Sequence, residues 1–116
     1  MEAANMSANV EAPEGLSDNG KAAHNAIMKM ANKHGIDYFG SQQTFYSPEE
    51  WSDRGEDYGC TSELVVMYED NGLKVLFDYD AAYPGYELLE EMNEALAEIG
   101  LFFECATCWY GSIHRV

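Results

Sequence analysis

The chain has 116 residues, of which 47% are hydrophobic, and its formal net charge is -15. This length and composition provide for one compact core, so we expect a single domain. The negative charge argues against nucleic acid and anionic membranes as direct ligands, because both would be repelled, and favours a basic protein as partner.

The N-terminal sequence MEAANMSANV lacks both the basic and the apolar region of a secretory signal. The longest apolar run, LVVM at 64–67, is far shorter than the roughly 20 residues that a membrane-spanning helix needs. Three cysteines without an export signal suit a reducing compartment. We therefore expect a cytoplasmic protein whose cysteines are thiols.

The first fifteen residues have no periodic apolar pattern, which predicts a mobile tail over 1–15 and a domain over 16–116. A helix should follow, with Ser17 or Asp18 as N-cap and Gly35 as stop signal. Its expected buried stripe consists of Ala23, Ile27, Met30 and Ala31. The segment YFGSQQTFY after this helix indicates a short strand.

A second, shorter helix is predicted at SPEEW, residues 47–51. Ser47 can cap it, Pro48 suits its first position, and Glu50 stands where a capping box places its acid. A polar loop with several glycines follows. The acidic side chains of this helix and loop are Glu49, Glu50, Asp53, Glu56 and Asp57.

The segment SELVVMYEDNGLKVLFDYD, residues 62–80, contains two apolar runs joined by Asn71 and Gly72. This pair suits a type I′ turn, so the pattern predicts a β-hairpin. With this register, one strand face would be core and the other a mixed outer surface, in which Glu63 lies opposite Asp80. The expected core residues are Leu64, Val66, Tyr68, Val75, Phe77 and Tyr79.

The segment YELLEEMNEALAEIG, residues 86–100, has the period of an amphipathic helix. Its buried stripe should be Leu88, Leu89, Met92, Leu96 and Ile99. A second stripe consists of Glu87, Glu90, Glu91, Glu94 and Glu98, with no lysine or arginine in the segment to relieve the repulsion. Glutamates at i and i+4 each cost roughly 0.2–0.5 kcal/mol, and mixed charges would serve solubility equally well.

Gly100 should end this helix, and LFFECATCWY, residues 101–110, reads as a buried C-terminal strand. The predicted fold class is α+β: an antiparallel sheet of three or four strands, made of the hairpin and the C-terminal strand, packed by two helices.

Cys60, Cys105, Cys108 and His114 supply the ligand count of a Cys3His zinc site, and a small zinc-binding module is one alternative. However, alternation along a strand would send Cys105 and Cys108 to opposite faces, so we expect no metal and no cofactor. An EF-hand reading fails because Tyr83 and Leu89 stand where its glycine and glutamate belong. We also expect no enzyme, since no catalytic motif is evident.

Residues 45–104 hold 16 acidic side chains against Arg54 and Lys74. In size, charge and α+β layout the chain resembles small acidic inhibitors encoded by phages and mobile elements, among them anti-CRISPR proteins and other DNA mimics. The resemblance implies a stoichiometric, non-catalytic inhibitor of a bacterial nucleic-acid-binding defence enzyme, acting in the host cytoplasm. The residues expected to contact this partner are Asp78 and Asp80, the five glutamates of residues 86–100, and the five acids of residues 49–57.

Two readings compete with this one. An acidic immunity protein or antitoxin that neutralises a basic toxin would use the same complementarity of charge. Alternatively, the glutamate stripe is only a solvated helix face, as most charged faces are.

Overall fold

The structure, a computed structural model, describes residues 10–40, 42–55, 61–78, 81, 85–107 and 109–116. In these ranges the helices are α2 (Asp18–Lys33), α3 (Pro48–Asp53), α4 (Lys74–Phe77) and α6 (Glu87–Glu98). The strands are β1 (Phe45–Tyr46), β2 (Leu64–Met67), β3 (Leu101–Cys105) and β4 (Tyr110–Arg115). Within the described ranges, every helix is too short or too polar to cross a membrane.

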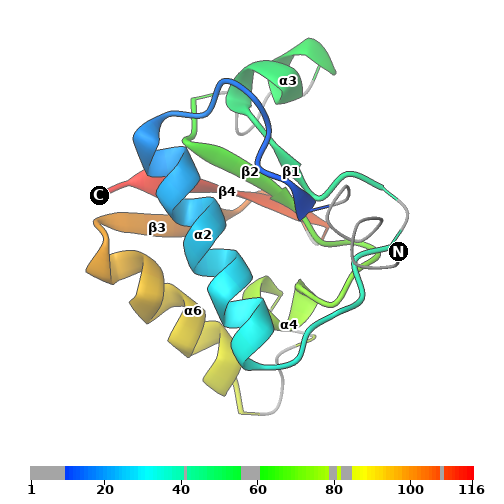
Figure 1. Cartoon of the computed structure of the whole chain (residues 1–116), viewed down its shortest axis with the longest axis vertical. Coiled ribbons are helices and arrows are strands. Elements are labelled where there is room, and N and C mark those ends of the chain that lie inside the picture. Colours follow the sequence, from blue (N-terminus) through cyan, green and yellow to red (C-terminus); the bar gives the residue numbers. More distant parts are fainter. Residues whose placement is uncertain (1–9, 41, 56–60, 79–80, 82–84, 108) are drawn as a thin grey trace.

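The four strands form one antiparallel sheet in the order β1-β2-β4-β3, which confirms the predicted α+β class. Helices α2 and α6 lie side by side in front of this sheet in Figure 1. Helix α3 lies apart from them, at the top of the view. β2 pairs with both β1 and β4, and β4 pairs with both β2 and β3, so β2 and β4 are the central strands. The edges of the sheet are therefore β1 and β3.

The two predicted N-caps are confirmed. Ser17 accepts a hydrogen bond from the Gly20 N–H at 3.0 Å and begins α2, and Gly35 follows the helix with a φ of +68°. Ser47 and Glu50 form the complete capping box of α3: the Ser47 hydroxyl accepts from the Glu50 N–H at 3.1 Å, and Glu50 Oε1 accepts from the Ser47 N–H at 3.0 Å.

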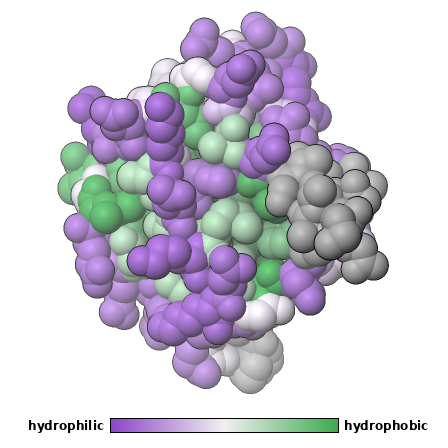
Figure 2. Space-filling model, in the orientation of Figure 1, coloured by the Kyte–Doolittle hydropathy of each residue, from purple (hydrophilic) through white to green (hydrophobic). Residues whose placement is uncertain are grey.

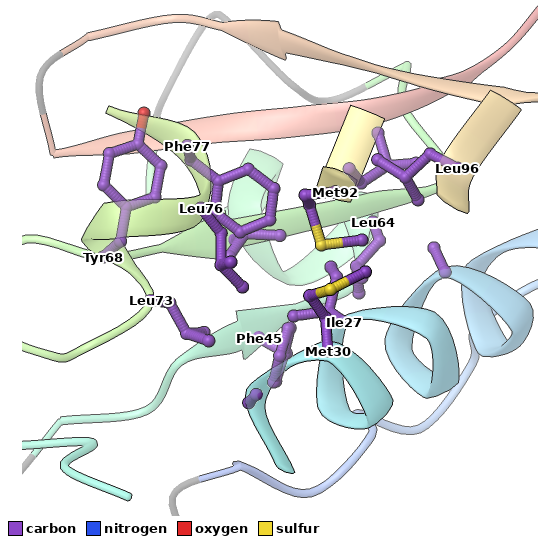
Figure 3. Close-up of a cluster of buried hydrophobic side chains, with 14 of the residues drawn as sticks. Ile27, Met30, Phe45, Leu64, Tyr68, Leu73, Leu76, Phe77, Met92 and Leu96 are labelled. Carbon is purple, nitrogen blue, oxygen red and sulfur yellow. The ribbon is translucent and has the colours of Figure 1, made fainter. Parts of the chain in front are cut away.

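The main core lies between the sheet and helices α2, α4 and α6. Figure 3 shows Ile27 and Met30 of α2 directed toward Met92 and Leu96 of α6, with Leu64 of β2 behind them. The predicted stripe of α2 is buried throughout. On α6 the buried residues are Leu89, Met92 and Leu96, whereas Ile99, which we expected inside, keeps 43% of its surface exposed at the end of the helix.

A second, smaller cluster covers the opposite face of the sheet. Val65 alternates with the core residues Leu64 and Val66 along β2 and therefore points away from α2 and α6. It packs against the fully buried Trp51 of α3 and against Tyr110 of β4. The prediction that this face of β2 forms a mixed outer surface is thus wrong, because Trp51 packs on Val65 and covers it.

The predicted hairpin at Asn71 and Gly72 is also wrong. Its first strand exists as β2, but the second half forms the helical turn α4. The buried Asn71 side chain redirects the chain: its Nδ2 donates to the Met67 carbonyl at 2.9 Å, and its Oδ1 accepts from the Leu73 N–H at 3.0 Å. Leu73, Leu76 and Phe77 are then all buried, which is helical spacing.

Both hydrogen-bonding edges of β2 are occupied, by β1 and by β4, so no edge remains for the expected partner strand. Glu63 contacts the Ser17 hydroxyl and, at 3.9 Å, Arg115. Asp80 and Tyr79 lie outside the described residues. Phe77 reaches the core as expected, but from a helix.

A β-hairpin does occur, at the C-terminus. Of the described residues in the segment read as one strand, 101–110, only β3 and the first residue of β4 are strand, and the rest of β4 lies in the last six residues of the chain. The two strands pair from Leu101 with Arg115 to Cys105 with Gly111. Of the two cysteines in this segment, Cys105 is the last residue of β3, and Cys108 lies outside the described residues. Of the predicted mobile tail, residues 1–9 also lie outside them, whereas Val10 packs against the core and its carbonyl oxygen lies 2.6 Å from His24 Nε2.

Candidate functional site

The glutamate stripe of α6 faces solvent over most of its length. Glu87, Glu90, Glu94 and Glu98 are exposed, on the side of the helix opposite to its buried leucines. None of these four carboxylates forms an ion pair with another described residue. Figure 2 shows hydrophilic residues over most of the face that carries α2 and α6. Four glutamates of the predicted site are therefore accessible as charges.

Glu91 differs from its neighbours because it is bound to α2. Its carboxylate forms an ion pair with Lys33, and its Oε1 lies 2.9 Å from His34 Nε2. The hydrogen bond from Lys33 is the main cause that lowers the pKa of Glu91, and His34 lowers it further, while desolvation opposes them. Glu91 thus joins the two helices, and this role could not be read from the sequence of α6.

The helix geometry places Glu91, and Glu98 seven residues later, on the side of α6 that faces α2. At 100° per residue, Glu91 leans toward the side of α6 that carries Leu88 and Ala95, whereas Glu90 leans toward the side of Asn93. Leu88 and Ala95 pack on the core beside α2. Lys29 and Lys33 of α2 line a hollow of about 560 Å³ between the two helices, together with Ala95, Glu98 and Ile99. Lysines of α2 therefore lie near the side of the stripe that faces α2. Glu90 does not line this hollow.

The acids of α3 do not join the stripe. Glu49, Glu50 and Asp53 are exposed, but α3 packs on the other face of the sheet. Glu50 also caps its own helix. Asp78 is half-buried directly after α4, and Glu56, Asp57 and Asp80 lie outside the described residues. Among the described residues, the acids of α3 and those of α6 thus form two separate acidic surfaces rather than one.

The zinc hypothesis concerns residues that the structure describes only in part, since Cys60 and Cys108 lie outside the described ranges. Cys105 is exposed, and its thiol donates to the Thr107 carbonyl at 3.1 Å. Within the described part of the chain, no three histidine, cysteine or acidic side chains gather as a metal site would require. The expectation of thiols remains a prediction.

Sequence reasoning missed a cluster of Ser112, His114 and Glu104. The Ser112 hydroxyl lies 2.8 Å from His114 Nε2, and Glu104 Oε1 lies 3.4 Å from the same nitrogen. A catalytic relay needs the acid and the serine on different ring nitrogens. Because both groups meet Nε2, this arrangement does not activate the serine. The spacing of Ser112 and His114, two residues apart, was the one sign in the sequence that both could lie on the same face of a strand.

Aromatic side chains around α3 form a second feature that the sequence did not reveal. The ring of Trp51 lies 4.8 Å from that of Tyr46 and 5.9 Å from that of Trp109, and the Arg54 guanidinium lies 4.5 Å above it. The Arg54 charge is therefore held against this cluster and contributes a cation–π contact.

Comparison with known protein families, with curated proteins and with solved structures finds no match to this chain.

Proposed function

We propose that the protein is a stoichiometric, non-catalytic inhibitor whose α6 face occupies the basic groove of a nucleic-acid-binding protein. The observation that carries the proposal is the row of Glu87, Glu90, Glu94 and Glu98, which are exposed and have no ion pair among the described residues. Charged rows on a helix usually alternate in sign, because like charges at i and i+4 repel. A row that keeps one sign suits a cationic partner.

The dimensions support a mimic of a phosphate backbone. From Glu87 to Glu98 the helix rises eleven residues, which is roughly 16 Å at about 1.5 Å per residue. One DNA strand carries a phosphate for about every 3.4 Å of axis, so this length matches the rise of about five nucleotides. Four carboxylates over that length offer a comparable density of negative charge on a rigid helix.

The test compares two double variants that remove the same charge from different surfaces. Glu90→Gln with Glu94→Gln changes α6, and Glu49→Gln with Asp53→Asn changes α3. Each protein is titrated into a panel of guide-RNA-loaded CRISPR effectors and restriction endonucleases that hold fluorescent target DNA, and displacement of the DNA is followed by anisotropy.

We expect wild type and the α3 variant to displace DNA from at least one effector at a molar ratio near one. The α6 variant should displace it less well, and the effect of wild type should weaken as salt rises. If no effector releases DNA, the proposed partner class is wrong. If both variants act like wild type, the stripe is a solvated face.

A further inference from the structure

The strand β3 forms an edge of the sheet whose outward backbone groups can be assigned. The Val116 N–H donates to the Gly100 carbonyl at 2.9 Å, and the Ala106 N–H donates to the Tyr110 carbonyl at 3.3 Å. Hydrogen bonding alternates along an antiparallel strand, so the even-numbered residues of β3 bond to β4. The N–H and C=O groups of Phe103 and Cys105 therefore point away from the sheet, and no described residue bonds to them.

A hollow of about 390 Å³ follows this edge. It is lined on β3 by four consecutive residues, from Phe102 to Cys105. Neighbouring residues of a strand point to opposite faces, so a hollow that touches four in a row must run along the edge rather than over one face. Its other walls are apolar side chains of α4 and α6 and one amide: Leu76, Phe77, Leu89 and Asn93.

The rim of the hollow is acidic. The Glu104 side chain is 65% exposed and lines it from β3. Glu90 stands three residues before Asn93 on α6, which makes the two side chains neighbours on the helix surface, and Glu90 is exposed. A second copy of this chain would bring a net charge of -15 and another Glu104 to the same edge. Charge therefore selects a cationic occupant over a second copy.

From these observations we infer that β3 binds an extended segment of a protein partner as a fifth strand of the sheet. The outward groups of Phe103 and Cys105 bond to the backbone of the segment, an apolar side chain enters the hollow against Leu76 and Leu89, and lysine or arginine side chains meet Glu104 and Glu90. The inference does not depend on a nucleic-acid-binding partner, so it stands or falls separately from the proposed function.

The test uses a short fluorescent peptide that alternates lysine and valine, and a second peptide of equal charge with proline in place of the central valine. Nonspecific attraction to an acidic protein would treat both peptides alike, whereas strand addition needs the central N–H. We expect the alternating peptide to bind about tenfold more tightly, the equivalent of 1.4 kcal/mol or one to two hydrogen bonds. It should also shift and protect the amides of Phe103 and Cys105 in NMR spectra.

Two variants of one position separate the backbone from the side chain. Cys105→Pro removes the outward N–H at an edge position that tolerates proline, and Cys105→Val keeps it. The proline variant should lose the preference for the alternating peptide while the valine variant retains it, and melting curves verify that both fold. The inference is overturned if the two variants bind alike, if the protected amides lie elsewhere, or if β3 instead pairs two copies in sedimentation experiments.

Discussion

Glu91 of α6 and His34, the C-cap of α2, are joined through Oε1 and Nε2 at a distance of 2.9 Å. With Lys33 they form a network between α2 and α6, and His34 and Glu91 are 57 residues apart along the chain. This contact ties the acidic helix to the rest of the fold, and it gives Glu91 a different role from the glutamates beside it.

Glu91→Gln should lower the melting temperature at neutral pH, because it removes the charge that Lys33 and His34 face. The pKa of Glu91 is lowered in the folded state, so its contribution is present above the unfolded pKa of about 4.3 and disappears as pH falls through the lowered folded value. Melting curves of wild type and variant should therefore converge in acid. Curves that stay equally separated from pH 7 to strongly acid conditions would contradict this role.

Glu94→Gln should behave in the opposite way. Glu94 stands four residues from both Glu90 and Glu98 and has no ion pair among the described residues, so its removal relieves two repulsions. We expect the free energy of unfolding to rise by roughly 0.5 kcal/mol at low salt. Urea titrations at low and high salt measure it, and a gain that does not shrink with salt would have a different origin.

Gly72→Ala should destabilise the fold, because the space beside Gly72 is too small for a Cβ. A Cβ at Gly72 would lie 2.7 Å from Ile36 Cγ2, whose β-branched side chain has little freedom to move. The expected cost is about 1–3 kcal/mol. In a double-mutant cycle with Ile36→Ala, the double variant should lose less stability than the sum of the two single losses, because the clash is absent once Ile36 is shortened. Strict additivity would place the strain elsewhere.

Trp51→Ala should cost about 3–5 kcal/mol of folding stability, since the side chain is fully buried between α3 and the sheet. Its Nε1 has no hydrogen-bond partner in the described part of the chain. Trp51→Phe deletes this donor together with part of the ring, and it should cost clearly less than the alanine variant. Equal losses in urea unfolding would mean that the indole nitrogen is bonded in solution.

Zinc analysis tests the thiol reading of the cysteines. Purified protein should hold less than one zinc per chain, and a chelator should leave its melting temperature unchanged. The positive control is the same chain refolded with added zinc. A stoichiometric metal whose loss melts the protein would establish the alternative site of Cys60, Cys105, Cys108 and His114.

The elements that the sequence predicted well are those with local signals. The caps and stripes of α2, α3 and α6 depend on residues within a few positions of one another, and so does the acidic row of α6. The segment LKVLF, residues 73–77, fits both periods, since Leu73 and Phe77 belong to either stripe. The segment forms a helix rather than a strand because the Asn71 side chain bonds to the Leu73 N–H and because β4 already occupies the edge of β2.

The parts of the site that escaped prediction are long-range contacts. Nothing near Glu91 in the sequence announces Lys33 or His34, and nothing near Val65 announces the cover provided by Trp51. The open edge of β3 was equally hidden, because one long strand was expected where a hairpin forms. A single sequence carries little information about such contacts, whose partners are set by tertiary packing.

The order of the strands also has a consequence for how the protein folds. Leu64 pairs with Ile113, so the two central strands join residues that are separated by about two fifths of the chain. The β3–β4 hairpin can form early because its strands are adjacent, but the centre of the sheet must wait until a large loop has closed. We expect folding in milliseconds to seconds rather than microseconds, and a ribosome must release almost all of residues 64–113 before β2 finds its partner.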